Sequence, residues 1–503
     1  MSRLKHNVIA NYAGGIWSAL MGIAFVPLYI HYLGIEAFGL IGVYIALQAW
    51  FIVIDMGFTP SLNREMARFD AGGISAHEAR QLIKTLEVIY CGTTLSVVLL
   101  IAILSPYITT HWLIVEQLDY STVENALIIM GATIGLRWFS TLYRGAMMGL
   151  QRQVWLSGNN AVFATLRGPG VILVLAYIDA SVEAFFISQG ALFVIECLVL
   201  RFKLNRLLPA VGKVGFSFDA IRRIWRFSAG VAGVSVLGAL LTQLDKILLS
   251  ALMPLSVLGY YTLASTVAGS LGALVAPVTN AAFPRFTELM SGKQLASLGT
   301  AYRELTQLLA AVVIPVACVI AVFASHLLLL WTRDPVITQN TSHILSILIL
   351  GSMLNGIMHL PYNLQLASGW TRLMFMTNLA AILVYVPLVY VGIQYLGVVA
   401  PAIFWLALNL AYVLLIIPLM HRVLLKDERL SWYRDALVLP LLASLFVVAI
   451  AKFLAPPPSS DNTIRDLLLL VVVSSSSLLA AALATPLGRS RWNGMVRNIK
   501  QWI

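Results

Sequence analysis

The chain has 503 residues, of which 59% are hydrophobic and only 11% are charged. Soluble domains carry about 25% charged residues, so this composition excludes an ordinary soluble protein and predicts a chain that crosses a membrane many times. The formal net charge of +11 would suggest nucleic acid as the partner of a soluble protein. In a membrane protein the basic residues are instead interpreted by their position relative to the spans, and we expect no nucleic-acid partner.

Apolar runs long enough to span a bilayer follow one another along nearly the whole chain. A hydrocarbon core about 30 Å thick requires about 20 largely apolar residues per helix. Fourteen runs meet this requirement, so we expect an all-α polytopic fold with about 14 transmembrane helices in the lipid bilayer. The predicted spans are 8–32, 37–58, 85–108, 123–146, 157–178, 182–204, 227–251, 256–283, 304–331, 341–366, 373–395, 398–420, 436–455 and 464–486.

Basic residues alternate between rich and poor loops. If the N-terminus is inside, the cytoplasmic segments hold most of the 33 Lys and Arg residues, whereas the outer segments hold or flank only Arg333, Lys452 and Arg465. Because Lys and Arg in short loops favour the cytoplasmic side, we expect both termini to be cytoplasmic.

A repeat divides the chain. Phe38-Gly39-Leu40 at the start of the second span is matched 220 residues later by Leu258-Gly259-Tyr260 at the start of the eighth, and Gly149 is matched by Gly369. The copies are six spans apart, so they run parallel and predict two six-helix lobes related by an axis along the membrane normal. We expect a first lobe over 1–204, a cytoplasmic linker with an amphipathic helix over 205–226, a second lobe over 227–421, and helices 13 and 14 with a cytoplasmic amphipathic tail over 422–503.

Three basic residues lie inside predicted spans and away from the span ends, where a charge costs about 2.5–3.5 kcal/mol even on lenient scales. They are Arg137 in the fourth span, Arg167 in the fifth and Lys246 in the seventh. Because guanidinium groups bind phosphate and carboxylate oxygens in bidentate fashion, we predict that these residues line a cationic cavity for an anionic cargo. The alternative is that each pairs with a carboxylate or with backbone carbonyls between helices.

Asp245 directly precedes Lys246. Neighbouring residues point about 100° apart on a helix, so the two are expected to have different partners. In one interpretation Lys246 faces the cavity and Asp245 ties its helix to a neighbour. In the other, both form a structural lock between the lobes.

Other polar residues allow more than one interpretation. We assign Asp55 and Arg64, at the cytoplasmic end of the second span, to a structural or gating ion network rather than to substrate contact. His359, in the most polar part of the tenth span, would suit proton coupling because its pKa lies near neutrality, and the alternative is a packing role. Glu196 lies near Arg201 and is interpreted as a residue that reaches the membrane interface.

Four stretches together resemble polysaccharide exporters of the Wzx type, within the multidrug/oligosaccharidyl-lipid/polysaccharide (MOP) superfamily. They touch both halves of the chain: Pro27-Leu28-Tyr29-Ile30 through Leu33-Gly34-Ile35-Glu36-Ala37-Phe38-Gly39; Asp55-Met56-Gly57-Phe58 with Asn63-Arg64-Glu65; Leu244-Asp245-Lys246 with Gly259-Tyr260-Tyr261; and Pro361-Tyr362-Asn363-Leu364-Gln365 with Gly369 and Arg372.

The resemblance implies a MOP-type fold whose two lobes enclose a central cavity that opens alternately to each side. It also implies a flippase of the bacterial inner membrane. The implied cargo is an undecaprenyl-pyrophosphate-linked repeat unit of O-antigen, capsule or exopolysaccharide, moved from the cytoplasmic to the outer leaflet. Polymerase and chain-length proteins of the same pathway are candidate partners, and the coupling ion, proton or sodium, is left open.

Two alternatives are weighed against this function. A multidrug cation antiporter on the same fold would be expected to have intramembrane acids dominating its cavity, whereas Arg137, Arg167 and Lys246 favour an anionic cargo. An O-antigen ligase or polymerase would carry a large outer loop with catalytic Arg or His residues, and the longest outer loop, roughly 109–122, contains His111 and no Arg. The sequence has no phosphate-cradling glycine loop, nucleophile elbow or metal-ligand spacing, so we expect a carrier without cofactor or metal rather than an enzyme.

Overall fold

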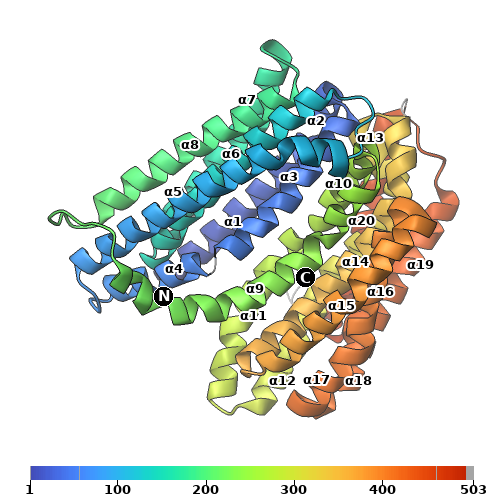
Figure 1. Ribbon diagram of the computed structural model, residues 1–503. Coiled ribbons are helices and arrows are strands. Elements are labelled where there is room, and N and C mark those ends of the chain that lie inside the picture. The colour runs from blue at the N-terminus through green and yellow to red at the C-terminus, as the bar shows by residue number, and fades with distance from the viewer. Residues whose placement is uncertain (1, 56, 460–461, 494–503) are drawn as a thin grey trace. The chain divides into compact units, whose positions relative to one another are not determined.

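The computed structural model describes residues 2–55, 57–459 and 462–493, and in these ranges the secondary structure is helical apart from turns and one isolated bridge between Ile114 and Pro254. Packing divides the chain into two compact units, Met1–Thr262 and Leu263–Ile503, each described here by itself (Figure 1). The predicted lobe boundary within 205–226 remains a prediction.

The helices of the first unit are α1 (Ser2–Ala24), α2 (Val26–Leu33), α3 (Ile35–Ile54), α4 (Phe58–Asp70), α5 (Ala76–Tyr107), α6 (Tyr120–Gly149), α7 (Gln153–Tyr177), α8 (Val182–Leu207) and α9 (Phe218–Leu252). Helix α10 (Leu255–Gly269) runs across the boundary in the sequence. The second unit continues with α11 (Gly272–Ser291), α12 (Leu295–Val322), α13 (Ala324–Thr332), α14 (Pro335–Ala367), α15 (Thr371–Leu396), α16 (Ala400–Ala411), α17 (Ile417–Leu424), α18 (Arg429–Tyr433), α19 (Leu439–Leu454) and α20 (Thr463–Ala484). Short π-helical turns follow α5, α16 and α18.

The described helices confirm an all-α membrane protein. Eleven helical segments within the described ranges are long and apolar enough to cross a membrane, and one of them, Arg372–Leu424, holds two predicted spans. The second predicted span corresponds to α3, which includes the shorter apolar stretch Ile35–Gln48, and the seventh corresponds to α9. Within the described residues, each of the fourteen predicted spans therefore falls on one helix or on consecutive helices.

Helix α6 is the centre of the first unit because α3, α4, α5 and α8 all pack against it, while α1 packs along α7. Its buried face is built from small and apolar residues such as Ala126, Met130 and Leu142. In a bilayer the hydrophobic effect does not drive helices together, so close van der Waals packing of small side chains stabilises this contact instead.

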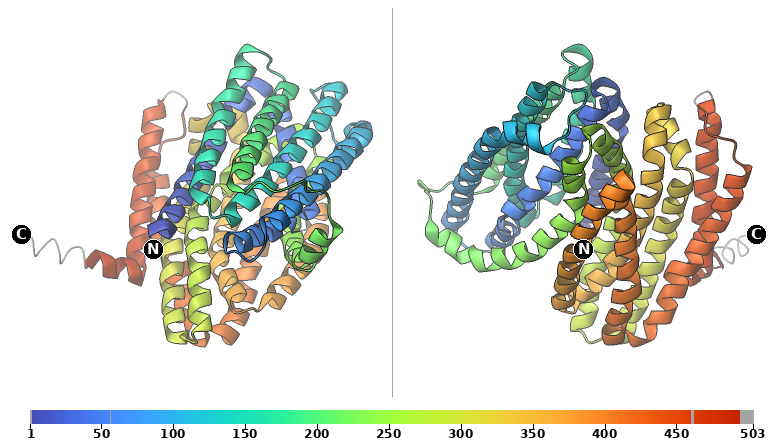
Figure 2. Two further views of the ribbon diagram at one scale, coloured as in Figure 1. Left: turned by 90° about the vertical axis from the view of Figure 1, so that its left-hand side faces the viewer. Right: turned by 45° about the vertical axis from the view of Figure 1, so that its right-hand side comes forward.

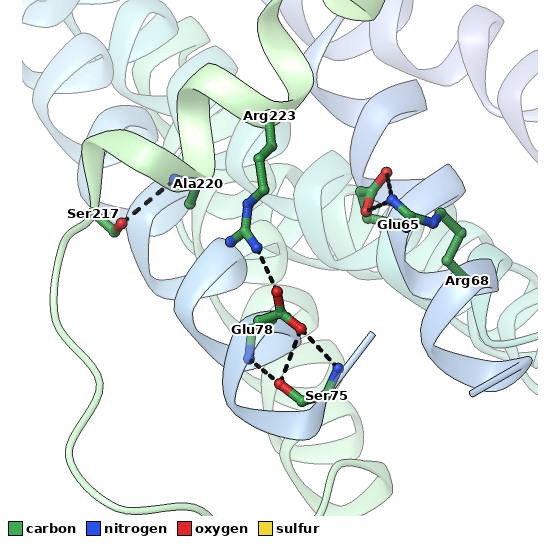
Figure 3. Close-up of polar contacts among 7 residues, drawn as sticks. All are labelled: Glu65, Arg68, Ser75, Glu78, Ser217, Ala220 and Arg223. Atoms are coloured by element: carbon green, nitrogen blue, oxygen red, sulfur yellow. Dashed lines mark hydrogen bonds and ion pairs between the residues drawn. The ribbon is translucent and has the colours of Figure 1, made fainter. Parts of the chain in front are cut away.

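Capping interactions fix where helices α5 and α9 begin. Ser75 caps α5 by accepting from the Glu78 N–H at 3.2 Å, and the Glu78 carboxylate accepts from the Ser75 N–H at 2.9 Å (Figure 3). This reciprocal capping box satisfies helix donors that would otherwise be unpaired. Arg223 of α9 pairs with Glu78 at 2.6 Å. The last part of the linker 205–226, in which an amphipathic helix is expected, is thus the beginning of the long helix α9, which Ser217 caps.

Helices α3 and α10 cross very closely at two glycines that the repeat relates. A Cβ atom added to Gly39 would lie 2.0 Å from the Leu255 carbonyl oxygen, and one added to Gly259 would lie 2.2 Å from the Ile35 carbonyl oxygen. Positions 35 and 39 correspond to 255 and 259 in the repeat, so the contact is locally two-fold. Only glycine allows the two backbones to approach to this distance.

A buried carboxylate holds the loop between α5 and α6. Glu36, in the first turn of α3, accepts backbone hydrogen bonds from Glu116 at 2.7 Å, Gln117 at 2.7 Å and Leu118 at 3.2 Å. Its side chain is 3% exposed. Three N–H donors satisfy the carboxylate, and no ion pair among the described residues involves it.

The second unit is organised around α12 and α14, which pack on each other and on α11, α16, α19 and α20. Helices α19 and α20 run side by side and both pack against α12 (Figure 2). A polar cluster joins α12 to the segment that leads into α19: Arg303 pairs with Glu428 at 2.6 Å, and Tyr302 lies within 3.2 Å of His421 Nε2. The two helices beyond the repeat are therefore attached to the second unit by apolar packing along α12 and by this cluster.

Candidate functional site

The first unit contains a cavity of about 720 Å³ between α1, α2, α3, α6, α7 and α8. Its wall combines apolar, amide and hydroxyl groups with three arginines. The lining residues are Ser18, Met21, Gly22, Tyr29, Ile41, Tyr44, Ile45, Gln48, Arg137, Ser140, Thr141, Arg144, Asn160, Ala164, Arg167, Gly168, Phe185, Gln189 and Phe193. Among these described wall residues there is no Asp or Glu.

Helical periodicity places the polar groups of α6 on the wall. Arg137, Ser140, Thr141 and Arg144 are three, four and seven positions apart, which puts them on one face of the helix. The same spacing brings Asn160 and Arg167 of α7 to the cavity. A pattern that is inconspicuous along the sequence therefore becomes a polar stripe when each helix turns one face inward.

Glu196 of α8 holds two of the arginines. One carboxylate oxygen accepts from Arg144 Nη2 and the other from Arg167 Nη2, and the Glu196 side chain is fully buried. Arg144 also donates to the side-chain oxygen of Asn160. The interpretation of Glu196 as an interfacial residue is therefore wrong, because its partners come from two other helices and not from Arg201.

Arg144, two residues before the end of the fourth predicted span (123–146), is not among the residues that the sequence predicted for the cavity. Its side chain is 25% exposed and lies on the cavity wall. The available signal was its spacing, since Arg144 lies seven residues after Arg137 and therefore on the same face of the helix.

Arg137 is the cavity arginine without a carboxylate partner among the ion pairs of the described residues. It donates a hydrogen bond to the Gln48 side-chain oxygen and is exposed to the cavity. Its guanidinium carbon lies 5.8 Å from the centre of the Phe193 ring, and that of Arg167 lies 4.0 Å from the same ring. Cation–π attraction of this kind favours a guanidinium group in a site with little water. The structure thus brings Arg137 and Arg167 together, as part of a group with Arg144, Glu196 and Phe193.

Lys246 is not among the residues that line this cavity. Its side chain is 7% exposed, and its ammonium group lies 3.5 Å from the Gln243 side-chain oxygen one turn earlier on α9. Asp245 accepts a hydrogen bond from the Tyr261 hydroxyl at 2.5 Å and so joins α9 to α10. The predicted substrate contact of Lys246 remains a prediction.

Asp55 lies between α3 and α4 in a network of neutral donors. Its carboxylate accepts from the Thr59 hydroxyl at 2.8 Å, from the Tyr90 hydroxyl and from the Trp138 indole at 3.3 Å. Arg64 is on an exposed face of α4. The structural or gating role assigned to Asp55 and Arg64 remains a prediction, and so does the role of Asp245 as a tie between helices or a structural lock.

His359 lies on α14 in the second unit, outside the described cavity, and its side chain is exposed. Nearby on the same helix, Asn355 bonds to Asn409 at 3.0 Å and Asn363 donates to the Thr279 carbonyl at 2.7 Å. These contacts are helix-to-helix ties, and a coupling role for His359 remains a prediction.

Comparison with known proteins assigns the chain to a family. Residues 4–290, more than half of the chain, match the family described as "Polysaccharide biosynthesis protein", and residues 231–391 match the MatE family. A Shigella flexneri protein named "Putative O-antigen transporter" is 21% identical over 405 residues, which cover 80% of this chain and 94% of that protein.

Solved structures show the same fold. The lipid II flippase MurJ in an inward closed conformation superposes with a TM-score of 0.72 at 13% identity, covering 94% of this chain and 97% of its own. An inward-facing multidrug resistance MATE family transporter of the MOP superfamily gives 0.61 at 13% identity, covering 84% and 94%. The expected MOP-type fold is therefore confirmed, and the chain belongs to the polysaccharide biosynthesis protein family, as its resemblance to Wzx-type flippases predicted.

Proposed function

We propose that this protein is a flippase that moves a lipid-linked oligosaccharide with a pyrophosphate headgroup from the cytoplasmic to the outer leaflet of a bacterial inner membrane. The observation that carries the proposal is the charge of the cavity. Arg137, Arg144 and Arg167 line it, and Glu196 behind them supplies one negative charge. The described site therefore has a surplus of two positive charges within the membrane-spanning part of the first unit.

Such a surplus is costly unless an anion offsets it. A charged group in the hydrocarbon region is rare and tends to mark a transport pathway, and guanidinium groups bind phosphate oxygens in a fixed bidentate geometry. A pyrophosphate diester has two negative charges and cannot cross the hydrocarbon unaided, because a buried anion without a partner is strongly unfavourable. The two negative charges of the cargo thus neutralise the two surplus positive charges of the cavity.

The remaining wall suits sugars. Gln48, Gln189 and Asn160 offer amide donors and acceptors, and Ser140 and Thr141 offer hydroxyls. Hydroxyl and amide groups can each donate and accept, so this wall can bind sugar hydroxyl groups of varied orientation. The printed names of the Shigella flexneri relative and of MurJ, an O-antigen transporter and a lipid II flippase, support the same class of cargo.

Transport by alternating access of two lobes, cytoplasmic termini and the pathway's polymerase and chain-length proteins as partners belong to this proposal. The charge distribution of the loops supports the orientation. A multidrug cation antiporter shares the fold, but the arginines on the described wall would repel a cationic cargo.

The test is transport in proteoliposomes that contain the full-length protein and a fluorescent polyprenyl-diphosphate oligosaccharide. The unaltered protein is expected to make the probe in the inner leaflet accessible outside, and Arg137→Ala and Arg167→Ala are expected to slow this strongly at equal protein levels. Arg285→Ala is the matched control, because Arg285 pairs with Glu288 on an exposed face of α11. Full transport in both cavity variants would exclude the proposed mechanism.

A further inference from the structure

Glu196 is a carboxylate that the cavity does not need for contact with an anionic cargo. It lies behind the wall, is fully buried, and connects three helices by pairing Arg144 of α6 and Arg167 of α7 with its own helix α8. Asn159 adds a longer contact to the same carboxylate at 3.5 Å. A buried acid is costly unless paired, and here two cations pair it.

The two arginines differ from an ordinary buried ion pair because they share one carboxylate. Both keep part of their surface on the cavity, at 25% for Arg144 and 21% for Arg167. The Nε atom of Arg167 is buried and has no hydrogen-bond partner. The buried Glu196 carboxylate thus positions both guanidinium groups, and its single negative charge neutralises only part of their charge.

The number of charges follows from this arrangement. Three arginines with Glu196 give a surplus of two, whereas three arginines without it would give a surplus of three. The cavity loaded with a diphosphate diester is therefore electrically balanced only when Glu196 is ionised. A surplus of three positive charges would bind a dianion more strongly than a surplus of two. It would also slow release of the dianion, because release must overcome the same attraction.

We propose that Glu196 is a positioning residue that limits the cavity to the two charges a diphosphate diester neutralises, so that the cargo binds without being retained. This inference rests on the proposed function and adds a requirement for release. Without the carboxylate charge, the cargo is expected to bind more tightly and to be transported more slowly.

The experiment uses full-length protein and two probes, a polyprenyl-diphosphate N-acetylglucosamine with two negative charges and a polyprenyl-phosphate glucose with one. Binding is measured in detergent and transport in proteoliposomes. The variants are Glu196→Gln, Arg144→Gln and the double variant Arg144→Gln/Glu196→Gln, whose cavities would have surpluses of three, one and two charges. Thermal melting and gel filtration identify any variant that does not fold.

Glu196→Gln is expected to bind the diphosphate probe about tenfold more tightly and to transport it about tenfold more slowly. Arg144→Gln is expected to bind it about tenfold more weakly. The double variant is expected to return both measurements toward those of the unaltered protein. The preference for the diphosphate over the monophosphate probe should rise and fall with the same charge count.

Several outcomes overturn the inference. If Glu196 were only a structural brace, Glu196→Gln would weaken both probes equally and leave their ratio unchanged. A double variant that binds and transports like Glu196→Gln would also contradict the charge count, and the double variant decides the case if Glu196→Gln does not fold. If the unaltered protein binds neither probe, the proposed function itself fails, whatever the variants do.

Discussion

Two buried carboxylates flank α6, and they are satisfied in opposite ways. Glu196 is paired with the guanidinium groups of Arg144 and Arg167. Asp55, which is 9% exposed, receives its hydrogen bonds from Thr59, Tyr90 and Trp138, all neutral, and none of the ion pairs in the described ranges involves it. The first arrangement leaves positive charge on a cavity, and the second leaves none.

The difference comes from which face of α6 each acid meets. Trp138 follows Arg137 directly, so the two side chains point about 100° apart. Trp138 is 5% exposed and stacks on Tyr90 with ring centres 4.1 Å apart, while Arg137 is exposed to the cavity. The comparison teaches that two faces of one membrane helix can hold a neutral polar network on one side and a positively charged cavity wall on the other.

Reversing the charge of Arg137 should have the largest effect, which is on transport through the arginine-lined cavity. Arg137→Glu lowers the surplus of the cavity by two charges and replaces neither Glu196 nor its two arginine partners, and transport of a diphosphate-linked probe is expected to fall about 100-fold. Arg137→Lys, which keeps the charge, should retain much of the activity in the same proteoliposome assay. Equal transport by both variants would show that transport does not depend on the charge at position 137.

Removing Asp55, whose partners are neutral donors, should lower the stability of the protein rather than its transport. Asp55→Ala removes the buried acceptor that Thr59, Tyr90 and Trp138 share, which is expected to cost about 1–3 kcal/mol. The measurement is thermal or denaturant unfolding in detergent, with probe binding as the second readout. A variant that is fully stable but cannot bind would show that Asp55 belongs to the binding wall.

The ring shared by two arginines offers a smaller change. Phe193→Leu keeps the apolar volume similar and removes the π-system beneath Arg137 and Arg167, for an expected loss of about 0.5–2 kcal/mol in binding of the diphosphate probe. Phe186→Leu is a suitable control, because Phe186 is fully buried and is not part of the cavity wall. An equal loss of binding in the control would point to packing rather than to cation–π attraction.

The smallest expected effect is the loss of one hydroxyl. Tyr90→Phe removes one donor to Asp55 and keeps the ring stacked on Trp138, so stability should fall by about 0.5–1.5 kcal/mol and transport should stay unchanged. Combining it with Asp55→Asn in a double-mutant cycle measures the coupling of the two groups. A coupling of zero would mean that the Asp55 network contributes nothing beyond its separate members.

Much of the architecture is predictable because hydropathy belongs to a segment by itself. An apolar run of sufficient length must be helical in a bilayer, since each backbone polar group needs a partner within the segment. Fourteen spans, a repeat and the family resemblance followed from that rule and from short motifs. Arg137 and Arg167 were recognised as unusual for the same local reason, because each lies within an apolar run.

What the sequence by itself determined is thus the fold class, an approximate number of spans and two of the cavity arginines. Only the tertiary structure decided that Glu196 meets Arg144 and Arg167, that Asp55 meets neutral donors, and that Lys246 lies off the described wall. These partners come from different helices, and contact between them depends on how each helix is rotated and how closely it packs. Rotation and packing are set by all neighbouring helices together, so no single segment of sequence contains them.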